Sequence, residues 1–221
     1  MRARWGPGLF SLEAVDFPAL RLPPYGAGQR IGLFGGSFNP PHRGHRHLAL
    51  TALRRLGLDQ VWWLVTPGNP MKRNDGLPPL ACRVAQARAL ADHPAMTVTA
   101  MEAAIGTRYS ADAVRFLRRR LPDVRLVWLM GADNLASLHR WQHWRDIMRL
   151  VPVAVIDRPG AGHAALNAPA AQAFAATRLP EADARAIADV EPPAWVFLHV
   201  PLEPSSSTAL RSSSTHSSAT S

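Results

Sequence analysis

The sequence predicts an α/β fold with a doubly wound, mostly parallel sheet and helices on both faces. Short apolar runs of the kind that form strands alternate along the chain with amphipathic segments of helical period. This alternation is typical of strands and helices wound around a single sheet. The chain has 221 residues, of which 47% are hydrophobic and 19% charged, and this composition is that of a folded domain rather than a disordered chain.

The expected elements begin near residue 30. Strands are expected in the apolar runs at 31–34, 61–66, 96–99, 125–130, 153–157 and 195–200. Helices are expected in the amphipathic segments at 44–56, 80–92, 110–121 and 137–149. The Ala- and Pro-rich stretch 160–194 has a weaker pattern, and we expect a short helical excursion there before the last strand.

One domain is expected, at residues 30–211, between two less regular ends. Residues 1–29 hold scattered Pro and Gly without periodicity, which predicts an N-terminal arm or an ill-ordered tail. Residues 212–221 are almost all Ser and Thr, which predicts a disordered tail. The sequence has neither the roughly 18–20 apolar residues of a membrane span nor a signal-peptide pattern. We therefore expect a cytoplasmic protein without a membrane partner.

The chain is strongly basic, which suggests anionic partners. Lys and Arg number 25 against 16 Asp and Glu, giving a formal net charge of +9, and the only lysine is Lys72. A non-catalytic nucleic-acid-binding protein would use the arginines in and after the segment 110–121, which are Arg115, Arg118, Arg119, Arg120 and Arg125. No recognised RNA- or DNA-binding motif accompanies them, so a solvated helix face is favoured and nucleic acid is not an expected partner. The single cysteine, Cys82, excludes an intrachain disulfide framework and a Cys-rich zinc site.

The most informative stretch joins the first expected strand to the first expected helix. It reads Gly35-Gly36-Ser37-Phe38-Asn39-Pro40-Pro41-His42-Arg43-Gly44-His45. It matches neither the Gly-x-Gly-x-x-Gly pattern nor a P-loop. In a doubly wound sheet this junction binds phosphates, because free backbone N–H groups and the helix dipole favour negative charge there.

Two histidines in this stretch are the candidate catalytic residues. His45 shares the helical phase of Leu48, Ala52 and other apolar residues, so we expect it in the first turn, facing inward. His42 lies three residues earlier and can approach the same point. Together they could donate hydrogen bonds to a phosphate that gains charge in a transition state. The alternative is a capping histidine beside an unrelated loop histidine.

The same stretch resembles the signature of the nucleotidyltransferase superfamily with the His-x-Gly-His motif. Within that superfamily the chain resembles the nicotinate-nucleotide adenylyltransferases of bacterial NAD synthesis, from about residue 30 to 211. The resemblance implies a Rossmann-like nucleotidyltransferase fold. It implies that ATP is bound by Gly35, Gly36, Ser37, Phe38, His42 and His45. It also implies that Ser37 and Asn39 contact nicotinate mononucleotide.

Two later segments carry the resemblance further. Residues 66–72 resemble the family's Pro-rich loop, which implies that Lys72 approaches the phosphates of ATP and the mononucleotide; Met71 replaces the family's usual His. Tyr109 and Ser110 follow Arg108 in a loop that resembles the family's Ser-Tyr-Thr loop. The resemblance implies that backbone N–H groups of this loop bind the nicotinate carboxylate, and Ser110 could also cap the helix that follows.

The remaining segments complete the expected site. Gly131 and Asp133 resemble the family's Gly-x-Asp turn at the adenosine, and Arg158 resembles its Arg-Pro turn near the adenine. Trp141 and Trp144 match the Trp-containing helix start that borders the pyridine ring, although tryptophans at this spacing are more often core residues. A second signature, in which Ser205 replaces the usual Ile, implies a second phosphate site made of Ser206, Ser207, Thr208 and Arg211.

The resemblance implies adenylyl transfer from ATP to nicotinate mononucleotide, with His45, His42, Lys72 and Arg211 as the catalytic residues. No Asp/Glu cluster in the sequence suggests a protein-built metal cage, so Mg²⁺ is expected to arrive with ATP. The alternatives are another phosphorylated acceptor, such as nicotinamide mononucleotide or phosphopantetheine, or the nucleic-acid-binding role.

Overall fold

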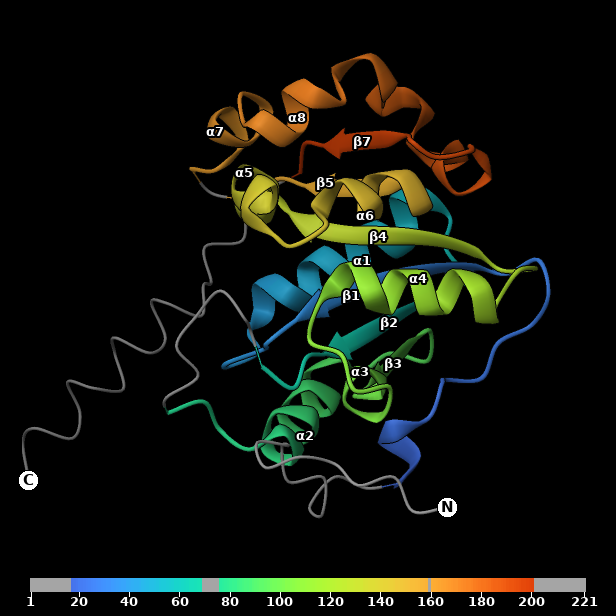
Figure 1. Ribbon diagram of the computed structural model, residues 1–221, viewed down its shortest axis with the longest axis vertical. Coiled ribbons are helices and arrows are strands. Elements are labelled where there is room, and N and C mark those ends of the chain that lie inside the picture. The colour runs from blue at the N-terminus through green and yellow to red at the C-terminus, as the bar shows by residue number, and fades with distance from the viewer. Residues whose placement is uncertain (1–16, 69–75, 159, 201–221) are drawn as a thin grey trace, which may run out of the picture.

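The computed structural model describes residues 17–68, 76–158 and 160–200. Its centre is a parallel sheet whose seven described strands lie in the order β3-β2-β1-β4-β5-β7-β6 (Figure 1). The strands are β1 (Arg30–Gly36), β2 (Gln60–Val65), β3 (Met96–Thr99), β4 (Arg125–Gly131), β5 (Val153–Ile156), β6 (Arg178–Leu179) and β7 (Trp195–Leu198). The predicted α/β fold with a parallel sheet is confirmed.

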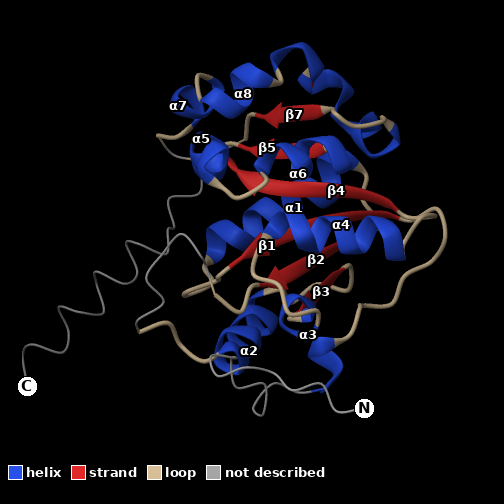
Figure 2. Cartoon of the chain, viewed as in Figure 1, coloured by secondary structure: helices blue, strands red, loops and turns tan. Residues whose placement is uncertain are grey.

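Helices cover both faces of the sheet, as Figure 2 shows in blue. The α-helices are α1 (Arg43–Leu56), α2 (Leu80–Leu90), α3 (Met101–Ala104), α4 (Ser110–Arg120), α5 (Ala132–Ser137), α6 (Trp144–Leu150), α7 (Gly162–Leu166) and α8 (Pro169–Ala173). The 3-10 helices are η1 (Phe17–Leu20), η2 (Leu138–Arg140), η3 (Ala175–Thr177) and η4 (Glu181–Asp189).

Two apolar layers hold the helices to the sheet. One layer lies between the sheet and α1, α2 and η4, and the other lies between the sheet and α4 to α8. Successive strand residues point into opposite layers: in β2, Trp63 belongs to the first layer and Trp62 to the second, and both are fully buried. Strands buried on both faces read as continuous apolar runs, which explains why the sequence predicts them well.

Helix α1 is positioned by its apolar stripe and by its C-terminal stop. Leu48, Ala49, Ala52 and Leu56 are buried against the sheet. The helix ends at Gly57, whose φ of 61° places it in the left-handed region and whose N–H donates to the Leu53 carbonyl. The first turn of α1 is thereby fixed at the carboxyl end of β1, where the candidate histidines lie.

Two regions differ from the sequence expectation. The expected helix at 137–149 is two elements, η2 and α6, because His143 adopts a left-handed φ of 54° between them. Residues 17–29 of the expected arm pack against the sheet: Ala19 is buried, and the Thr99 hydroxyl donates to the carbonyls of Ala19 and Arg21 at 3.0 and 2.9 Å.

The strand order reverses beside β1. The chain winds from β1 outward to β2 and β3, then returns to the other side of β1 as β4. In doubly wound sheets this reversal opens a crevice at the carboxyl ends of the two central strands, and ligands bind there. The loops that follow β1 and β4 are the ones that the sequence singles out.

Candidate active site

The candidate site combines residues from the carboxyl ends of three strands, β1, β4 and β5. The loop after β1 leads to His42 and α1, β4 ends at Gly131, and Arg158 follows β5. A Cβ added at Gly131 would collide with Asp133 Oδ1 and lie 2.7 Å from Arg158 Nε. Because Gly131 has no side chain, Arg158 can cross the end of β4 and come to 3.6 Å from Asp133 Oδ1.

His42 and His45 lie side by side at the start of α1. Their ring centroids are 3.8 Å apart, and the backbone N–H of His42 donates to Nδ1 of His45 at 3.1 Å. Since Nδ1 of His45 accepts a hydrogen bond, the proton of the neutral ring lies on Nε2. His45 therefore has a fixed tautomer and one N–H group left to donate.

The electrostatic surroundings keep His45 neutral. Burial, followed by the nearby His42 and Arg158, lowers the pKa of His45 from 6.5 to about 2. Arg158 contributes least of the three to this lowering of the His45 pKa. The two residues come from different strand ends, so the structure brings together a neutral N–H donor and a permanent cation.

An aromatic cluster packs against the ring of His45. Phe38 is buried, stacks on Trp63 with ring centroids 5.0 Å apart, and meets the edge of Phe34 at 5.4 Å. The ring centroid of His45 is 5.1 Å from that of Phe38. Phe38 has a positive φ of 45°, a conformation that costs energy for a bulky residue, and packing on Trp63 holds it there.

Four of the residues predicted to bind the mononucleotide lie near the starts of α4 and α6. Tyr109 is half-buried and is the N-cap residue of α4. Ser110 is the first helical residue, so the expectation that Ser110 caps this helix is wrong. Trp141 is half-buried, whereas Trp144 is a core residue against Phe174, with ring centroids 5.8 Å apart. Trp141 is thus the more accessible of the two tryptophans.

Part of the predicted site falls beyond the described residues. Lys72 and the second signature, with Ser206, Ser207, Thr208 and Arg211, lie outside the described ranges. Among the predicted residues that are described, Gly35 and Gly36 end β1, and Ser37 and Asn39 lie in the loop that follows. An added Cβ at Gly35 would lie 2.5 Å from Trp128 Cη2, so only glycine fits against this buried indole.

Arg83 is a site residue that the sequence reasoning missed. It lies on α2, only 1% exposed, and its guanidinium donates to four described carbonyl groups. These are Ser37 and Thr66 from Nη1, both at 2.8 Å, Pro67 from Nη2 at 3.0 Å and Pro78 from Nε at 3.0 Å. One side chain thus joins the loop after β1 to the segment after β2. Burial lowers the pKa of Arg83 to about 10, so it stays charged at neutral pH.

Glu102 on α3 is a second missed residue. It is 2% exposed, and its side chain hydrogen-bonds to the hydroxyl of Thr66, which itself donates to the Gly68 carbonyl at 3.0 Å. Its backbone carbonyl accepts from the N–H of Thr107 at 3.0 Å. Burial raises the pKa of Glu102 from 4.5 to about 7, and the Thr66 hydrogen bond opposes that rise.

Comparison with known proteins identifies the family. Residues 33–213 match the cytidylyltransferase-like family. A protein of Methylorubrum extorquens named "Probable nicotinate-nucleotide adenylyltransferase" is 60% identical over 182 residues, which cover 82% of this chain and 98% of that protein. A Bradyrhizobium sp. protein of the same name is 60% identical over 76% of this chain and 88% of its own length. A Rhizobium meliloti protein of the same name is 54% identical over 82% of this chain and 97% of its own length.

The chain belongs to the nicotinate-nucleotide adenylyltransferase family. This membership confirms the family predicted from the His-x-Gly-His stretch. A solved structure from Plasmodium falciparum, a nicotinic acid mononucleotide adenylyltransferase complexed with APC, has a TM-score of 0.60 at 13% identity and covers 83% of each chain. At that identity the likeness shows the fold alone, which is the Rossmann-like nucleotidyltransferase fold.

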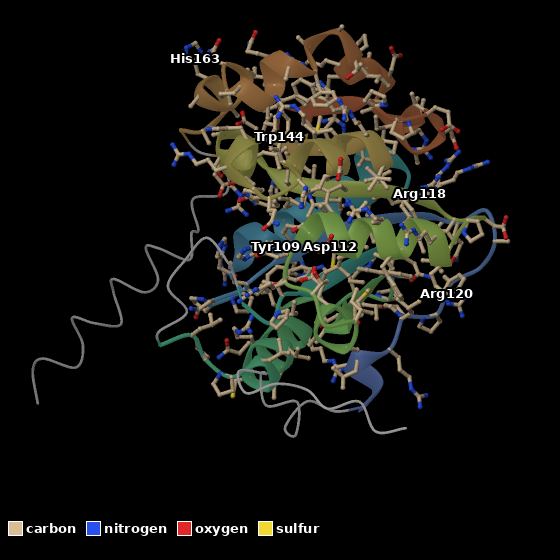
Figure 3. All side chains as sticks on the ribbon, in the orientation of Figure 1. Tyr109, Asp112, Arg118, Arg120, Trp144 and His163 are labelled. Carbon is tan, nitrogen blue, oxygen red and sulfur yellow. The ribbon has the colours of Figure 1, made fainter. Side chains whose placement is uncertain are left out.

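Two of the arginines considered for nucleic acid, Arg118 and Arg120, lie at the other end of α4 from Tyr109 (Figure 3). In Figure 3, Tyr109 and Asp112 mark one end of α4, whereas Arg118 and Arg120 lie toward the other end. Two other members of the set form ion pairs: Arg115 with Asp112 and Asp146, and Arg125 with Asp189. These contacts favour a solvated, salt-bridged surface for the set.

The described part of the chain offers neither a metal cage nor a membrane span. It contains no group of three or more His, Cys, Asp or Glu side chains that could hold a metal ion. Among the same residues, no helix is both long and apolar enough to cross a membrane.

Replacing Arg83 by Met should destabilise the protein by about 2–4 kcal/mol, because several buried carbonyl groups would lose their donor. Urea unfolding of Arg83→Met measures the loss. Arg88→Met is the matched control, since it removes an exposed arginine from the same helix. Equal stability of the two variants would show that the Arg83 contacts contribute nothing.

Replacing Glu102 by Gln should stabilise the protein increasingly as pH rises. The folded-state pKa of about 7 lies above the unfolded value of 4.5. The folded protein therefore holds this proton more tightly, and the wild type loses stability as pH rises from about 4.5 to about 7. Unfolding free energies of wild type and Glu102→Gln, measured between pH 5 and 8, should diverge over this window. Exposed Glu191→Gln is the control, and a constant difference for Glu102→Gln would contradict the raised pKa.

Proposed function

We propose that the chain transfers the adenylyl group of ATP to nicotinate mononucleotide, giving nicotinate adenine dinucleotide and pyrophosphate in NAD biosynthesis. The observation that carries the proposal is the His42–His45 pair at the start of α1, after the carboxyl end of β1. The names and identities of the relatives support the choice of substrates. Because both substrates are metabolites of the cell interior, we infer a cytoplasmic location.

The reaction makes modest demands on the protein. A phosphate oxygen of the mononucleotide forms a bond to the α-phosphorus of ATP while the bond from that phosphorus to pyrophosphate breaks. The phosphate monoester is largely dianionic at neutral pH, since its second pKa is about 6, and pyrophosphate leaves as an anion. Neither group needs a protein base or a covalent nucleophile. Catalysis therefore rests on aligning two anions and balancing the charge at the α-phosphate.

His45 suits this task through its fixed tautomer. Its Nε2–H is free of the contact with the His42 backbone, which uses Nδ1, and in our proposal it donates to an oxygen of the α-phosphate. Such a hydrogen bond strengthens as charge develops in the transition state. His42, the N-terminus of α1 and Arg158 act on the same anion. Asp133, which faces Arg158, is proposed at the adenosine.

We assign the outer phosphates to Lys72 and Arg211, with Ser206, Ser207 and Thr208 beside them. Lysine presents a compact charge on a flexible stem, which suits a leaving polyphosphate that moves during the reaction. The described residues build no metal cage, so we infer that Mg²⁺ enters as part of the ATP complex and neutralises charge on the β- and γ-phosphates.

We place the mononucleotide between the starts of α4 and α6. Backbone N–H groups at the N-terminus of α4 face an anion favourably, and they would bind the nicotinate carboxylate beside Tyr109 and Ser110. Half-buried Trp141 would border the pyridine ring, with Trp144 supporting it from the core. Ser37 and Asn39 on the loop after β1 complete this proposed contact set.

The test of the proposed function is an acceptor comparison. Pyrophosphate release from ATP should be fastest with nicotinate mononucleotide and at least about tenfold slower with nicotinamide mononucleotide, because only the nicotinate carboxylate is an anion for the α4 N-terminus. Phosphopantetheine should give background rates. Preferential transfer to nicotinamide mononucleotide or phosphopantetheine would replace the proposed acceptor. Salt-dependent nucleic-acid binding without transfer would overturn the proposal.

Replacing His45 by Ala should lower kcat by about 100-fold or more, because the N–H donor to the α-phosphate is lost. Urea unfolding should show the variant folded. His93→Ala is the control: His93 is half-buried and precedes β3 at the amino ends of the strands. Near-normal turnover of His45→Ala would rule out this mechanism.

A further inference from the structure

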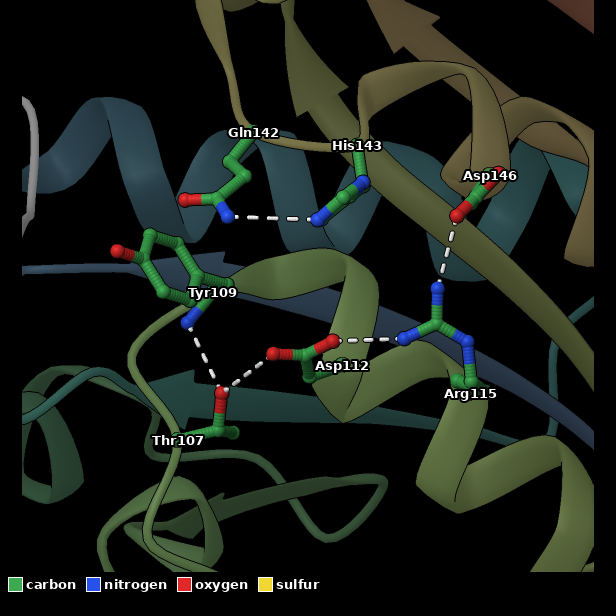
Figure 4. Close-up of polar contacts among 7 residues, drawn as sticks. All are labelled: Thr107, Tyr109, Asp112, Arg115, Gln142, His143 and Asp146. Carbon is green, nitrogen blue, oxygen red and sulfur yellow. Dashed lines mark hydrogen bonds and ion pairs between the residues drawn. The ribbon is translucent and has the colours of Figure 1, made fainter.

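A chain of polar contacts joins the two segments proposed to hold the pyridine nucleotide. The acceptor loop (residues 106–110) precedes α4, and the Trp141 turn (residues 141–143) precedes α6. The two helices pack beside each other on one face of the sheet. Figure 4 shows the Tyr109 side chain directed toward the segment that holds Gln142 and His143. The relative position of these two segments fixes the width of the proposed pyridine site.

Arg115 is the link in this chain of contacts (Figure 4). The Thr107 hydroxyl accepts from the N–H of Tyr109 at 3.1 Å and donates to Asp112 Oδ2 at 3.3 Å. Arg115 then donates from Nη1 to Asp112 Oδ1 at 2.6 Å and from Nη2 to Asp146 Oδ2 at 2.8 Å. Asp112 lies in the first turn of α4 and Asp146 in the first turn of α6. One guanidinium thus spans the starts of both helices.

The charge of Arg115 matters because an anion is expected at the same end of α4. In the first turn, the N–H groups of Ser110 and Ala111 have no acceptor among the described residues, so they can receive a carboxylate. Asp112, which lies in the same first turn, would repel a carboxylate bound there. Arg115 offsets the charges of Asp112 and Asp146 and weakens that repulsion.

We propose that Arg115 is a positioning residue that sets the preference for nicotinate over nicotinamide. Its guanidinium offsets the charge of Asp112 beside the nicotinate carboxylate and holds the acceptor loop against the Trp141 turn. This inference rests on the proposed function. If these ion pairs only stabilised the fold, replacing Arg115 would leave the acceptor preference unchanged. The side chains of Arg115, Asp112 and Asp146 are 32%, 40% and 38% exposed. Ion pairs at such positions contribute little to stability.

The experiment compares kcat/KM for nicotinate and nicotinamide mononucleotides in the full chain. Arg115→Met should raise the KM for nicotinate mononucleotide about tenfold and change the KM for ATP less than about threefold. The KM for nicotinamide mononucleotide, whose amide group is uncharged, should also change less than about threefold. The preference for nicotinate mononucleotide should therefore fall. The melting temperature should shift by about 4 °C or less.

Two further variants distinguish the effect of the Arg115 charge from a general disturbance of the structure. Asp112→Asn added to Arg115→Met should restore much of the nicotinate preference, because the repelling carboxylate is then absent. Arg119→Met removes the same charge from an exposed position of α4 and should leave the preference unchanged.

The outcomes distinguish the inference from the proposed function. If the wild type prefers nicotinate and Arg115→Met keeps this preference, the role of Arg115 alone is overturned. The same holds if Arg115→Met weakens the use of both acceptors and of ATP equally. A wild type that transfers no adenylyl group to nicotinate mononucleotide would overturn the proposed function and the inference with it.

Discussion

The guanidinium of Arg83 donates to backbone carbonyl groups in two loops at the candidate site. Carbonyl groups that are buried without donors are costly. Arg83 satisfies those of Ser37 and Thr66 with a single nitrogen atom and those of Pro67 and Pro78 with the other two. Because the fork is planar and rigid, the loop after β1 and the segment after β2 are set relative to one another before any substrate binds.

The neutrality of His45 follows from the same buried architecture. An imidazolium ion would attract a phosphate more strongly, but burial and the nearby Arg158 make that charged state expensive. The protein instead separates two tasks. Permanent positive charge comes from Arg158 and the N-terminus of α1, whereas His45 offers a directed N–H group whose tautomer is fixed by the His42 backbone. Directed donors that need no rearrangement act most strongly where charge develops during the reaction.

Much of the fold could be predicted from the sequence because its signals are local. Strands buried on both faces form continuous apolar runs, and all six expected strands are found within two residues of their expected limits. The expected helix at 137–149 failed because apolar residues keep a helical spacing across the break at His143, while the left-handed φ there ends the helix. Two-residue β6 pairs with β7, and nothing in so short a segment signals a strand.

The candidate site was predictable only where a motif marks it. His42, His45 and Arg158 lie next to recognisable turns that follow β1 and β5 in the structure. Arg83 gave a weaker signal. It shares the buried face of α2 with Leu80, Val84 and Ala87, and a charged residue on a buried face needs buried hydrogen-bond partners. Its acceptors include carbonyls 46, 17 and 16 residues away along the chain. Only the tertiary structure identifies them.

The net charge of +9 shows why position matters more than total charge. Arg83 is buried and serves carbonyl groups, Arg115 offsets two carboxylates, and Arg118 and Arg120 lie toward the far end of α4 from Tyr109. Of the arginines described, Arg158 is the one whose charge reaches His45. A basic chain attracts anions over its whole surface, but an adenylyl transfer needs them in line at one point. That point is set by the reversal of strand order beside β1, which brings the start of α1 to the same edge of the sheet as the ends of β4 and β5.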